Sequence, residues 1–426
     1  MTNDLTARLR PALAEIFDAR TEPVPAVSVA VLLDGELATI AFGAEPAARF
    51  QSCSISKSIA AATALRLGLD LDTDVNDYLR SWTLPSPEDW RPVVTVRHLL
   101  SHTGALTVHG FPGYAEGDRV PSAVDVLDGT GGANTDPVRI DGVPGVTHRY
   151  SGGGYQILQL IIEDLTGDSF AETAAELVFA PLGMDTAGYD VPPVVAPAHD
   201  KGEPIKGGWH TYPEQAAAGL WCTPADLVRF FTALRESAEG GPQPFLPPEL
   251  AAEMLTECVP GYGLGVRVAP DPLGDRFGHT GSNEGYRCAA EASRREGWAI
   301  AAMTNANEGT VLVGRLIEAA AEALGIARTP EPVDPEGEYL QWLDRHAGEY
   351  RTEHGTVLRL DIIDDYLHLV VPGQPPLIFG RTGDTSAYAP YAHAELRFAA
   401  SGGSVESLTL HQFGSSTLAV RQSVDG

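Results

Sequence analysis

The chain has 426 residues, 43% of them hydrophobic and 20% charged, so it is long and apolar enough for two or three packed cores and is not a disordered protein. It carries 57 acidic against 29 basic residues, a formal net charge of −28, and we expect neither nucleic acid nor a membrane surface among its partners. Four cysteines without a CxxC spacing indicate reduced, mostly buried thiols rather than a disulfide framework or a zinc site.

The first elements along the chain are a helix, a hairpin and a second helix. They are predicted over 5–17, over 26–33 and 37–42, and over 56–67. Asp34-Gly35 between the two strands is a dipeptide typical of a tight hairpin turn, and Gly68 ends the second helix. A helix followed by an antiparallel hairpin argues against a doubly wound parallel sheet.

The middle of the chain, to about residue 240, is rich in short helical patterns and in loops of Gly and Pro. Strand patterns return after it. The predicted elements are helices over 95–101 and 156–166, strands over 262–268, 286–292 and 298–304, and a helix over 310–324. The two groups of strands predict an α/β (α+β) domain whose sheet is split in sequence by a helical insert at about 65–245.

The last hundred residues have a different character. Residues 328–337 hold three prolines and no apolar periodicity, so we interpret them as a linker between a domain over 1–327 and a second over 338–426. Short alternating runs predict a C-terminal antiparallel β-barrel or sandwich. Its predicted strands are 357–360, 366–371, 394–398, 407–411 and 417–421.

Ser54 and Lys57 are the first candidates for chemistry. They lie three residues apart at the start of the predicted helix 56–67, so their side chains project to the same side. A serine hydroxyl is a weak nucleophile that needs an adjacent base, and a lysine desolvated by an apolar wall can serve as one. The chain has only three lysines, Lys57, Lys201 and Lys206, which makes this placement specific.

Two further segments pair polar or aromatic side chains with glycines. Tyr150 precedes Gly152-Gly153-Gly154 at the start of a helix, and a tyrosine beside a lysine can shuttle a proton. His279-Thr280-Gly281-Ser282-Asn283 comes just before a predicted strand, where a backbone N–H can stabilise an oxyanion. A second His-Thr-Gly, 102–104, ends a helix, and we interpret His98 and His102 as structural.

In this order, Ser54-x-x-Lys57, Tyr150 and His279-Thr280-Gly281 resemble the serine β-lactamase-related hydrolases. This family joins class C β-lactamases, DD-peptidases, D-aminopeptidases and β-lactamase-fold esterases. Family-like phrases at 95–104, 181–184 and 219–227 agree, and the resemblance covers about 26–325. It implies a β-lactamase/transpeptidase-like antiparallel sheet flanked by helices, and the C-terminal strands resemble a lipocalin-like accessory barrel.

The resemblance implies acyl transfer through a serine ester. Lys57 and Tyr150 together would remove the proton of Ser54, and which of them is the base stays open. Tyr150, supported by His279, would return the proton to the leaving group. The residues implied in substrate binding or in the oxyanion site are Ser54, Gly152, Thr280, Gly281, Ser282 and Asn283, with the N–H groups of Ser54 and Ser282 as the oxyanion donors.

Two departures from the family pattern bear on the substrate. Gly152 stands where many members have an asparagine, so an amide that would bond a substrate carbonyl is missing. His279 replaces the lysine of the penicillin-binding motif, which removes a fixed charge that would pair with a substrate carboxylate. Both changes favour esters or D-amino-acid amides over β-lactams.

We therefore expect a serine hydrolase of the esterase or D-amino-acid peptidase type, acting on a small-molecule or short-peptide acyl substrate. An acyltransferase or peptide-cyclising thioesterase of the same fold is the alternative within enzymes, and a non-catalytic penicillin-binding-like sensor is the alternative outside them. No cofactor and no metal are expected, since nucleotide motifs and a third ligand beside His98 and His102 are missing. Without a signal peptide or apolar span the protein is expected to be cytoplasmic, and its oligomeric state stays open.

Overall fold

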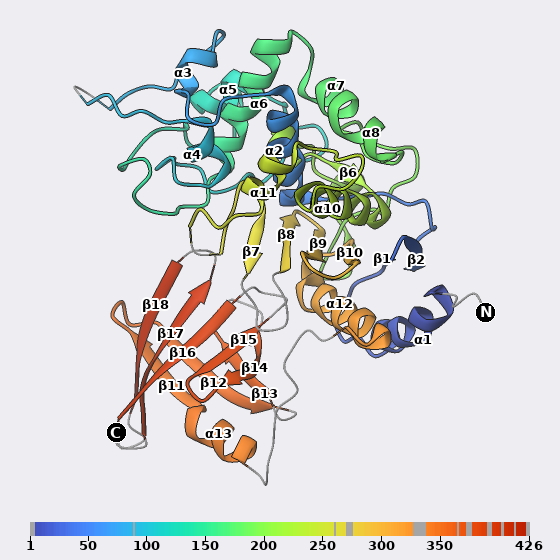
Figure 1. The fold of residues 1–426 in the computed structure, drawn as a ribbon, viewed down its shortest axis with the longest axis vertical. Helices are drawn as coiled ribbons and strands as arrows, with labels where there is room; N and C mark the ends of the chain where they lie inside the picture. Colours follow the sequence, from blue (N-terminus) through green and yellow to red (C-terminus); the bar gives the residue numbers. More distant parts are fainter. Residues whose placement is uncertain are drawn as a thin grey trace. The chain divides into compact units, whose positions relative to one another are not determined.

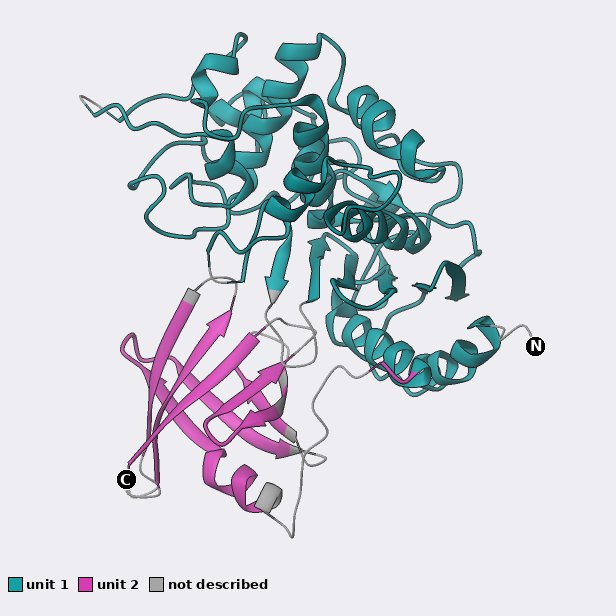
Figure 2. Cartoon of the chain, viewed as in Figure 1, with its two compact units in different colours: residues 1–268, 275–324 teal, residues 269–274, 325–426 magenta. Residues whose placement is uncertain are grey.

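The computed structural model describes residues 5–87, 90–259, 261–269, 276–326, 338–363, 366–371, 377–389, 394–401, 404–412 and 415–422. The chain divides into two compact units, 1–268 with 275–324 and 269–274 with 325–426 (Figure 2). The predicted linker 328–337 lies outside the described residues. Of the helices that are described, none has the length and apolar character needed to cross a lipid bilayer.

The first unit is built on a six-stranded sheet of order β2-β1-β10-β9-β8-β7 (Figure 1). Its strands are β1 (Val27–Leu33), β2 (Glu36–Phe42), β7 (Arg267–Ala269), β8 (Arg276–Asn283), β9 (Tyr286–Ser293) and β10 (Trp298–Thr304). β1 pairs antiparallel with β2, through the predicted Asp34-Gly35 turn, and with β10. The predicted sheet that is split in sequence is thus confirmed. The pairing of β1 with β10 joins its two groups of strands.

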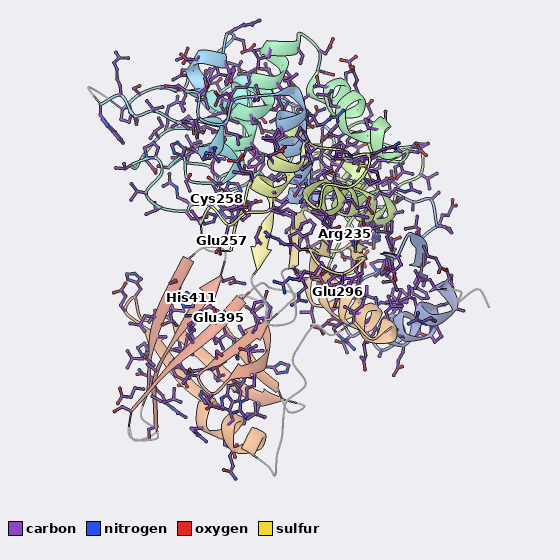
Figure 3. The ribbon with its side chains drawn as sticks, in the orientation of Figure 1. Arg235, Glu257, Cys258, Glu296, Glu395 and His411 are labelled. Carbon is purple, nitrogen blue, oxygen red and sulfur yellow. The ribbon has the colours of Figure 1, made fainter. Side chains whose placement is uncertain are left out.

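Helices cover both faces of this sheet. α1 (Leu5–Asp18) and α12 (Thr310–Leu324) pack on each other and on one face, and α10 (Pro224–Ala238) packs across β1, β9 and β10 on the other. Every residue of β10 is buried, as expected for a strand covered on both sides. Arg235 ties the end of α10 to the β9–β10 turn, because its guanidinium donates to the Glu296 carbonyl at 2.7 Å (Figure 3).

The helical region between β2 and β7 carries most of the remaining elements. Its helices are α2 (Ser56–Leu67), α3 (Val75–Tyr78), α4 (Val96–Leu100), α5 (Ala123–Asp128), α6 (Gly152–Thr166), α7 (Phe170–Ala174), α8 (Ala180–Leu182), α9 (Gln215–Ala218) and α11 (Pro248–Met254), with short strands β3 (Phe50–Gln51), β4 (His199–Asp200), β5 (Glu203–Pro204) and β6 (Trp221–Cys222). α2 is buried along nearly its whole length and ends at Gly68 in the left-handed conformation, as predicted.

Two sequence predictions in this unit are wrong in their bounds, and one strand was not predicted. The strand expected over 262–268 is reduced to β7, because Tyr262 lies in a turn closed by backbone bonds with Val259. The helix expected from residue 156 begins at Gly152, because the Ser151 hydroxyl caps it by accepting from the Gly154 N–H. The His279-Thr280-Gly281 segment comes before the predicted strand, which is β9, and it is itself part of β8, a strand that was not predicted from the sequence.

The second unit is an antiparallel barrel of eight strands in sequence order, closed where β11 pairs with β18. The strands are β11 (Gly348–Thr352), β12 (Val357–Ile363), β13 (Tyr366–Val370), β14 (Leu377–Gly383), β15 (Ser386–Ala389), β16 (Ala394–Ser401), β17 (Ser404–Gln412) and β18 (Ser415–Arg421), after the helix α13 (Glu338–His346). The predicted C-terminal β-barrel is confirmed. Buried apolar and aromatic side chains, Trp342, Tyr350 and Phe379 among them, form its core.

Two glycines with a left-handed backbone test how tightly α2 is enclosed. An added Cβ at Gly265 would come 2.5 Å from the Ala61 Cβ of α2, whereas at Gly68 it would meet nothing within 4 Å. We predict that Gly68→Ala lowers the free energy of unfolding by about 1 kcal/mol through backbone strain alone. Gly265→Ala adds a further cost of about 1–3 kcal/mol from overpacking. Urea denaturation measures both, and equal midpoints for the two variants would show that α2 is not packed as described.

Candidate functional site

The turn before α2 presents Ser54. β3 pairs with β6, and the Ser52 N–H donates to the Leu220 carbonyl at 2.8 Å, so the turn is anchored on both sides. Cys53 follows with φ +50°, a conformation uncommon outside glycine and costly unless the surroundings enforce it. Ser54 then lies in a short 3₁₀ turn, Cys53–Ile55, that runs directly into α2. Within this turn the Ile55 N–H donates to the Ser52 carbonyl at 3.0 Å, and the Ser56 N–H donates to the Cys53 carbonyl.

Lys57 is held against Ser54 inside the protein. Its side chain is 2% exposed, and Nζ donates to Ser54 Oγ at 3.1 Å and to the Ala217 carbonyl of α9 at 2.7 Å. Nζ also lies 5.0 Å from the ring centre of Tyr150 and 5.7 Å from that of Tyr155. The predicted serine–lysine pair is therefore in direct contact, with Tyr150 beside it.

β8 lies directly against the Ser54 turn. A Cβ on Gly281 would fall 2.7 Å from both the Cys53 Cβ and the Ser52 carbonyl oxygen, so only glycine permits this approach. Ser282 is exposed and Thr280 half-buried on this stretch. The buried Asn283 amide donates to Gln51 Oε1 at 2.7 Å and to the Ala218 carbonyl at 3.1 Å. These bonds tie β8 to β3 and α9.

Gly152 lies at the first turn of α6 under the ring of Phe111. A Cβ there would come 2.9 Å from Phe111 Cε2, and the Gly152 N–H donates to the His109 carbonyl at 2.9 Å. At the position that carries an asparagine in many members of the resembled family, a side chain would thus require the Phe111 ring to shift. A binding role for Gly152 could come only from its backbone.

Tyr150 rests on two histidines. Its ring centre is 4.1 Å from that of His102 and 5.0 Å from that of His109, and it is 6.3 Å from that of His279. His102 is 2% exposed, so the ring of Tyr150 packs against a buried imidazole. The structure brings Ser54, Lys57, Tyr150 and His279 into one cluster. It adds His102, which the sequence indicated only as a helix end.

His98 lies on α4 and makes its hydrogen bonds at the start of that helix. Its side chain completes a capping box with Thr95, since its Nδ1 accepts from the Thr95 N–H at 3.2 Å. Burial lowers its pKa below 6.5. His98 therefore serves the start of α4, as a structural residue does.

A buried carboxyl group near the site was not indicated by any sequence motif. Glu214 precedes α9, is fully buried, and neither of its carboxylate oxygens contacts a hydrogen-bond partner from another residue. Burial raises its pKa to about 8. Gln156 of α6 is also fully buried with its amide unpartnered. Gln159, one turn further on, bonds Pro213 and Ala216 on either side of Glu214, so both orphan groups lie near the α6–α9 contact.

The four cysteines are free thiols, and Cys53, Cys222 and Cys288 are buried. This confirms the expectation drawn from their spacing. The Cys288 Sγ donates to the Ser52 carbonyl at 3.1 Å, and Ser52 Oγ lies 2.8 Å from the Cys222 Sγ. The buried thiols therefore pack under the Ser54 turn.

A helix-flanked antiparallel sheet with a buried serine–lysine pair at the start of a central helix defines the class that the motifs indicated. Residues 13–325 match the family model described as Beta-lactamase, which is most of the chain. The chain belongs to the Beta-lactamase family, and the resemblance stated from the motifs is confirmed.

Individual relatives match over shorter stretches. The chain is 32% identical over 204 residues to a D-aminopeptidase of Gluconobacter oxydans (strain 621H), covering 44% of this chain and 36% of that protein. It is 34% identical over 185 residues to penicillin-binding protein 4 of Amycolatopsis lactamdurans, covering 40% and 46%. The chain thus matches less than half the length of either relative. The crystal structure of SurE with D-Leu shares the fold over 98% of this chain and 100% of that one, with a TM-score of 0.59 at 23% identity.

We predict that Glu214 makes stability depend on pH. Between about 4.5, the ordinary pKa of a glutamate, and about 8 the folded protein keeps a proton that the unfolded chain has released. Stability should therefore fall as pH rises through this window, by a few kcal/mol in all. Glu214→Gln should remove this dependence. The melting temperature of the variant, relative to that of the unaltered protein, should therefore rise from pH 5 to pH 9.

The exposed Glu176 supplies the matched control, because Glu176→Gln should track the unaltered protein at every pH. Thermal unfolding at several pH values measures the difference. A gain for Glu214→Gln that does not grow with pH would contradict the assigned burial of the carboxylate.

Proposed function

We propose that the protein is a serine hydrolase that forms an acyl-enzyme on Ser54 from an ester or amide. The observation that carries the proposal is the buried Lys57 Nζ, 3.1 Å from Ser54 Oγ. A hydroxyl in contact with a desolvated lysine that lies beside a tyrosine has a pair of groups that can take its proton, as a serine nucleophile requires.

The proposed reaction starts with Lys57 and Tyr150 taking the proton of Ser54. Ser54 Oγ bonds the substrate carbonyl carbon, and the N–H groups of Ser54 and Ser282 stabilise the oxyanion. Tyr150 returns the proton to the leaving group as its bond to the carbonyl breaks. Water then attacks the ester and releases the acid. Since Lys57 and Tyr150 lie together, they exchange protons as a coupled pair and no single base is assigned.

The part of His279 in the proposed reaction is inferred from its two hydrogen bonds. Its Nε2 lies 2.9 Å from Tyr262 Oη and its Nδ1 2.6 Å from the Thr280 carbonyl. These contacts support a role in holding β8 against the site next to Tyr150. Gly281 supports the same part of the scheme, because it lets β8 reach the Ser54 turn.

For the substrate we propose esters or D-amino-acid amides. The similarity to a D-aminopeptidase supports amides of D-amino acids, as does the likeness in fold to SurE, whose structure holds D-Leu. An acyltransferase or peptide-cyclising thioesterase would use the same acyl-enzyme with an amine or alcohol in place of water. A non-catalytic sensor is disfavoured, because a binding module has no need to bury one of three lysines against a serine.

We predict that Ser54→Ala abolishes hydrolysis of a nitrophenyl ester, with a loss of at least about a thousandfold in kcat/KM. Ser58→Ala is the matched control. Ser58 is a buried serine one turn along α2 whose hydroxyl donates to the Gly265 carbonyl at 2.6 Å, so its loss should leave turnover within a few fold. Steady-state kinetics measures both. Full activity of a folded Ser54→Ala protein would show that the nucleophile is elsewhere.

We also predict that short-chain esters or D-amino-acid amides have a kcat/KM far above that of penicillins, because Gly152 and His279 remove groups that would bind a carboxylated lactam. Gly152→Asn alone should not raise penicillin turnover, since Phe111 occupies the space of its side chain. Gly152→Asn combined with Phe111→Ala opens that space. Comparable kcat/KM values for a penicillin and an ester in the unaltered protein would contradict this preference.

A further inference from the structure

The two His-Thr-Gly segments of the chain meet inside the protein through one tyrosine. His102 ends α4 and His279 lies on β8, yet the Tyr262 hydroxyl contacts both, 3.1 Å from His102 Nε2 and 2.9 Å from His279 Nε2. All three side chains are at most 2% exposed. His102 also adopts φ +57°, a strained backbone that points to a constraint on where its ring lies.

The backbone groups at the two ends of this row of hydrogen bonds, the Ser151 N–H and the Thr280 carbonyl, determine which atom donates in each bond. The Ser151 N–H donates to His102 Nδ1 at 3.1 Å, so a neutral His102 must carry its proton on Nε2 and donate to Tyr262. The Tyr262 hydroxyl then donates to His279 Nε2. His279 carries its proton on Nδ1, which donates to the Thr280 carbonyl at 2.6 Å.

The surroundings of His102 favour the neutral form of its ring that these hydrogen bonds need. Burial, and next the positive charge of Lys57, hold the pKa of His102 well below 6.5. The titratable groups that face His102 are Lys57 on α2, His109, His148 and Tyr150 in the loops before α6, Tyr155 on α6, Tyr262, and His279 on β8. No carboxylate is among these described neighbours, so no negative charge favours an imidazolium there.

We propose that Tyr262 and His102 are positioning residues of the Ser54 site, which hold Tyr150 and the Thr280 segment of β8 in fixed relation to Lys57. His102 supports the ring of Tyr150 from below and, through Tyr262, locks His279 onto the Thr280 carbonyl. The peptide that follows Thr280 leads to Gly281 and Ser282, where the proposed oxyanion donor lies. The inference rests on the proposed function, and it adds two residues to which no motif assigned a part in the site.

If these contacts had a purely structural role, substitutions and histidine tautomers would behave differently. An aromatic cluster that only fills space would lose stability when Tyr262 is changed, but it would not depend on which nitrogen of each imidazole carries the proton. Hydrogen bonds that position the site require His102 as the Nε2–H tautomer and His279 as the Nδ1–H tautomer. The tautomers therefore separate the two interpretations without any assay of activity.

The first experiment is ¹⁵N NMR of the full chain with labelled histidine, with signals assigned by single substitutions. We expect His102 to stay neutral from pH 5.5 to 8, and both rings to show the tautomers given above. Tyr262→Phe should change the nitrogen shifts of His102 and His279 and leave those of His98 in place. Opposite tautomers, or a charged His102 in this range, would overturn the proposal whatever the activity of the protein.

The second experiment compares Tyr262→Phe with Tyr286→Phe, which also removes a buried tyrosine hydroxyl bonded at 2.7 Å, to the Ala196 carbonyl. We expect Tyr262→Phe to lower kcat for a nitrophenyl ester at least about tenfold with KM changed little, while Tyr286→Phe loses similar thermal stability and less than threefold in kcat. Equal effects of the two variants would overturn the proposal. Failure of the proposed function itself would differ, because Ser54→Ala would then leave turnover unchanged.

Discussion

Burial of the Lys57 side chain is the constraint on which the rest of the site depends. An amine that is 2% exposed must find acceptors within the protein, and Lys57 finds them in Ser54 Oγ and the Ala217 carbonyl. The second contact joins α2 to α9, and the chain continues from α9 to β6, which pairs with β3 just before Ser54. Lys57 also adds to the burial of His102 itself, which is the larger cause, in holding the pKa of His102 well below 6.5.

The fold could be predicted from the sequence where apolar periodicity and turn residues agreed. The hairpin around Asp34-Gly35, the buried helix ended by Gly68 and the helix over 310–324 are local patterns that tertiary contacts reinforce. The Ser54–Lys57 contact was predictable for the same reason, because three residues on one helix turn fix the geometry without knowledge of the rest of the chain.

The remaining features depend on contacts between distant segments. Tyr262 looked like part of a strand, and its place between two histidines arises from α4, β8 and a turn that meet only in the folded chain. Phe111 over Gly152 and the orphan carboxyl of Glu214 likewise come from loops without a periodic pattern. The contacts of Asn283 are of the same kind, since its amide donates to Gln51 and to Ala218, which are both distant in sequence.

Covalent labelling tests the central claim most directly. The protein would be treated with a serine-directed fluorophosphonate, and the mass of the intact chain and of its proteolytic peptides would be measured before and after. The account predicts a single adduct on the peptide that contains Ser54, formed more slowly when Lys57 is replaced by Met. An adduct on another residue, or no adduct in a folded protein, would contradict the assignment of Ser54 as the nucleophile.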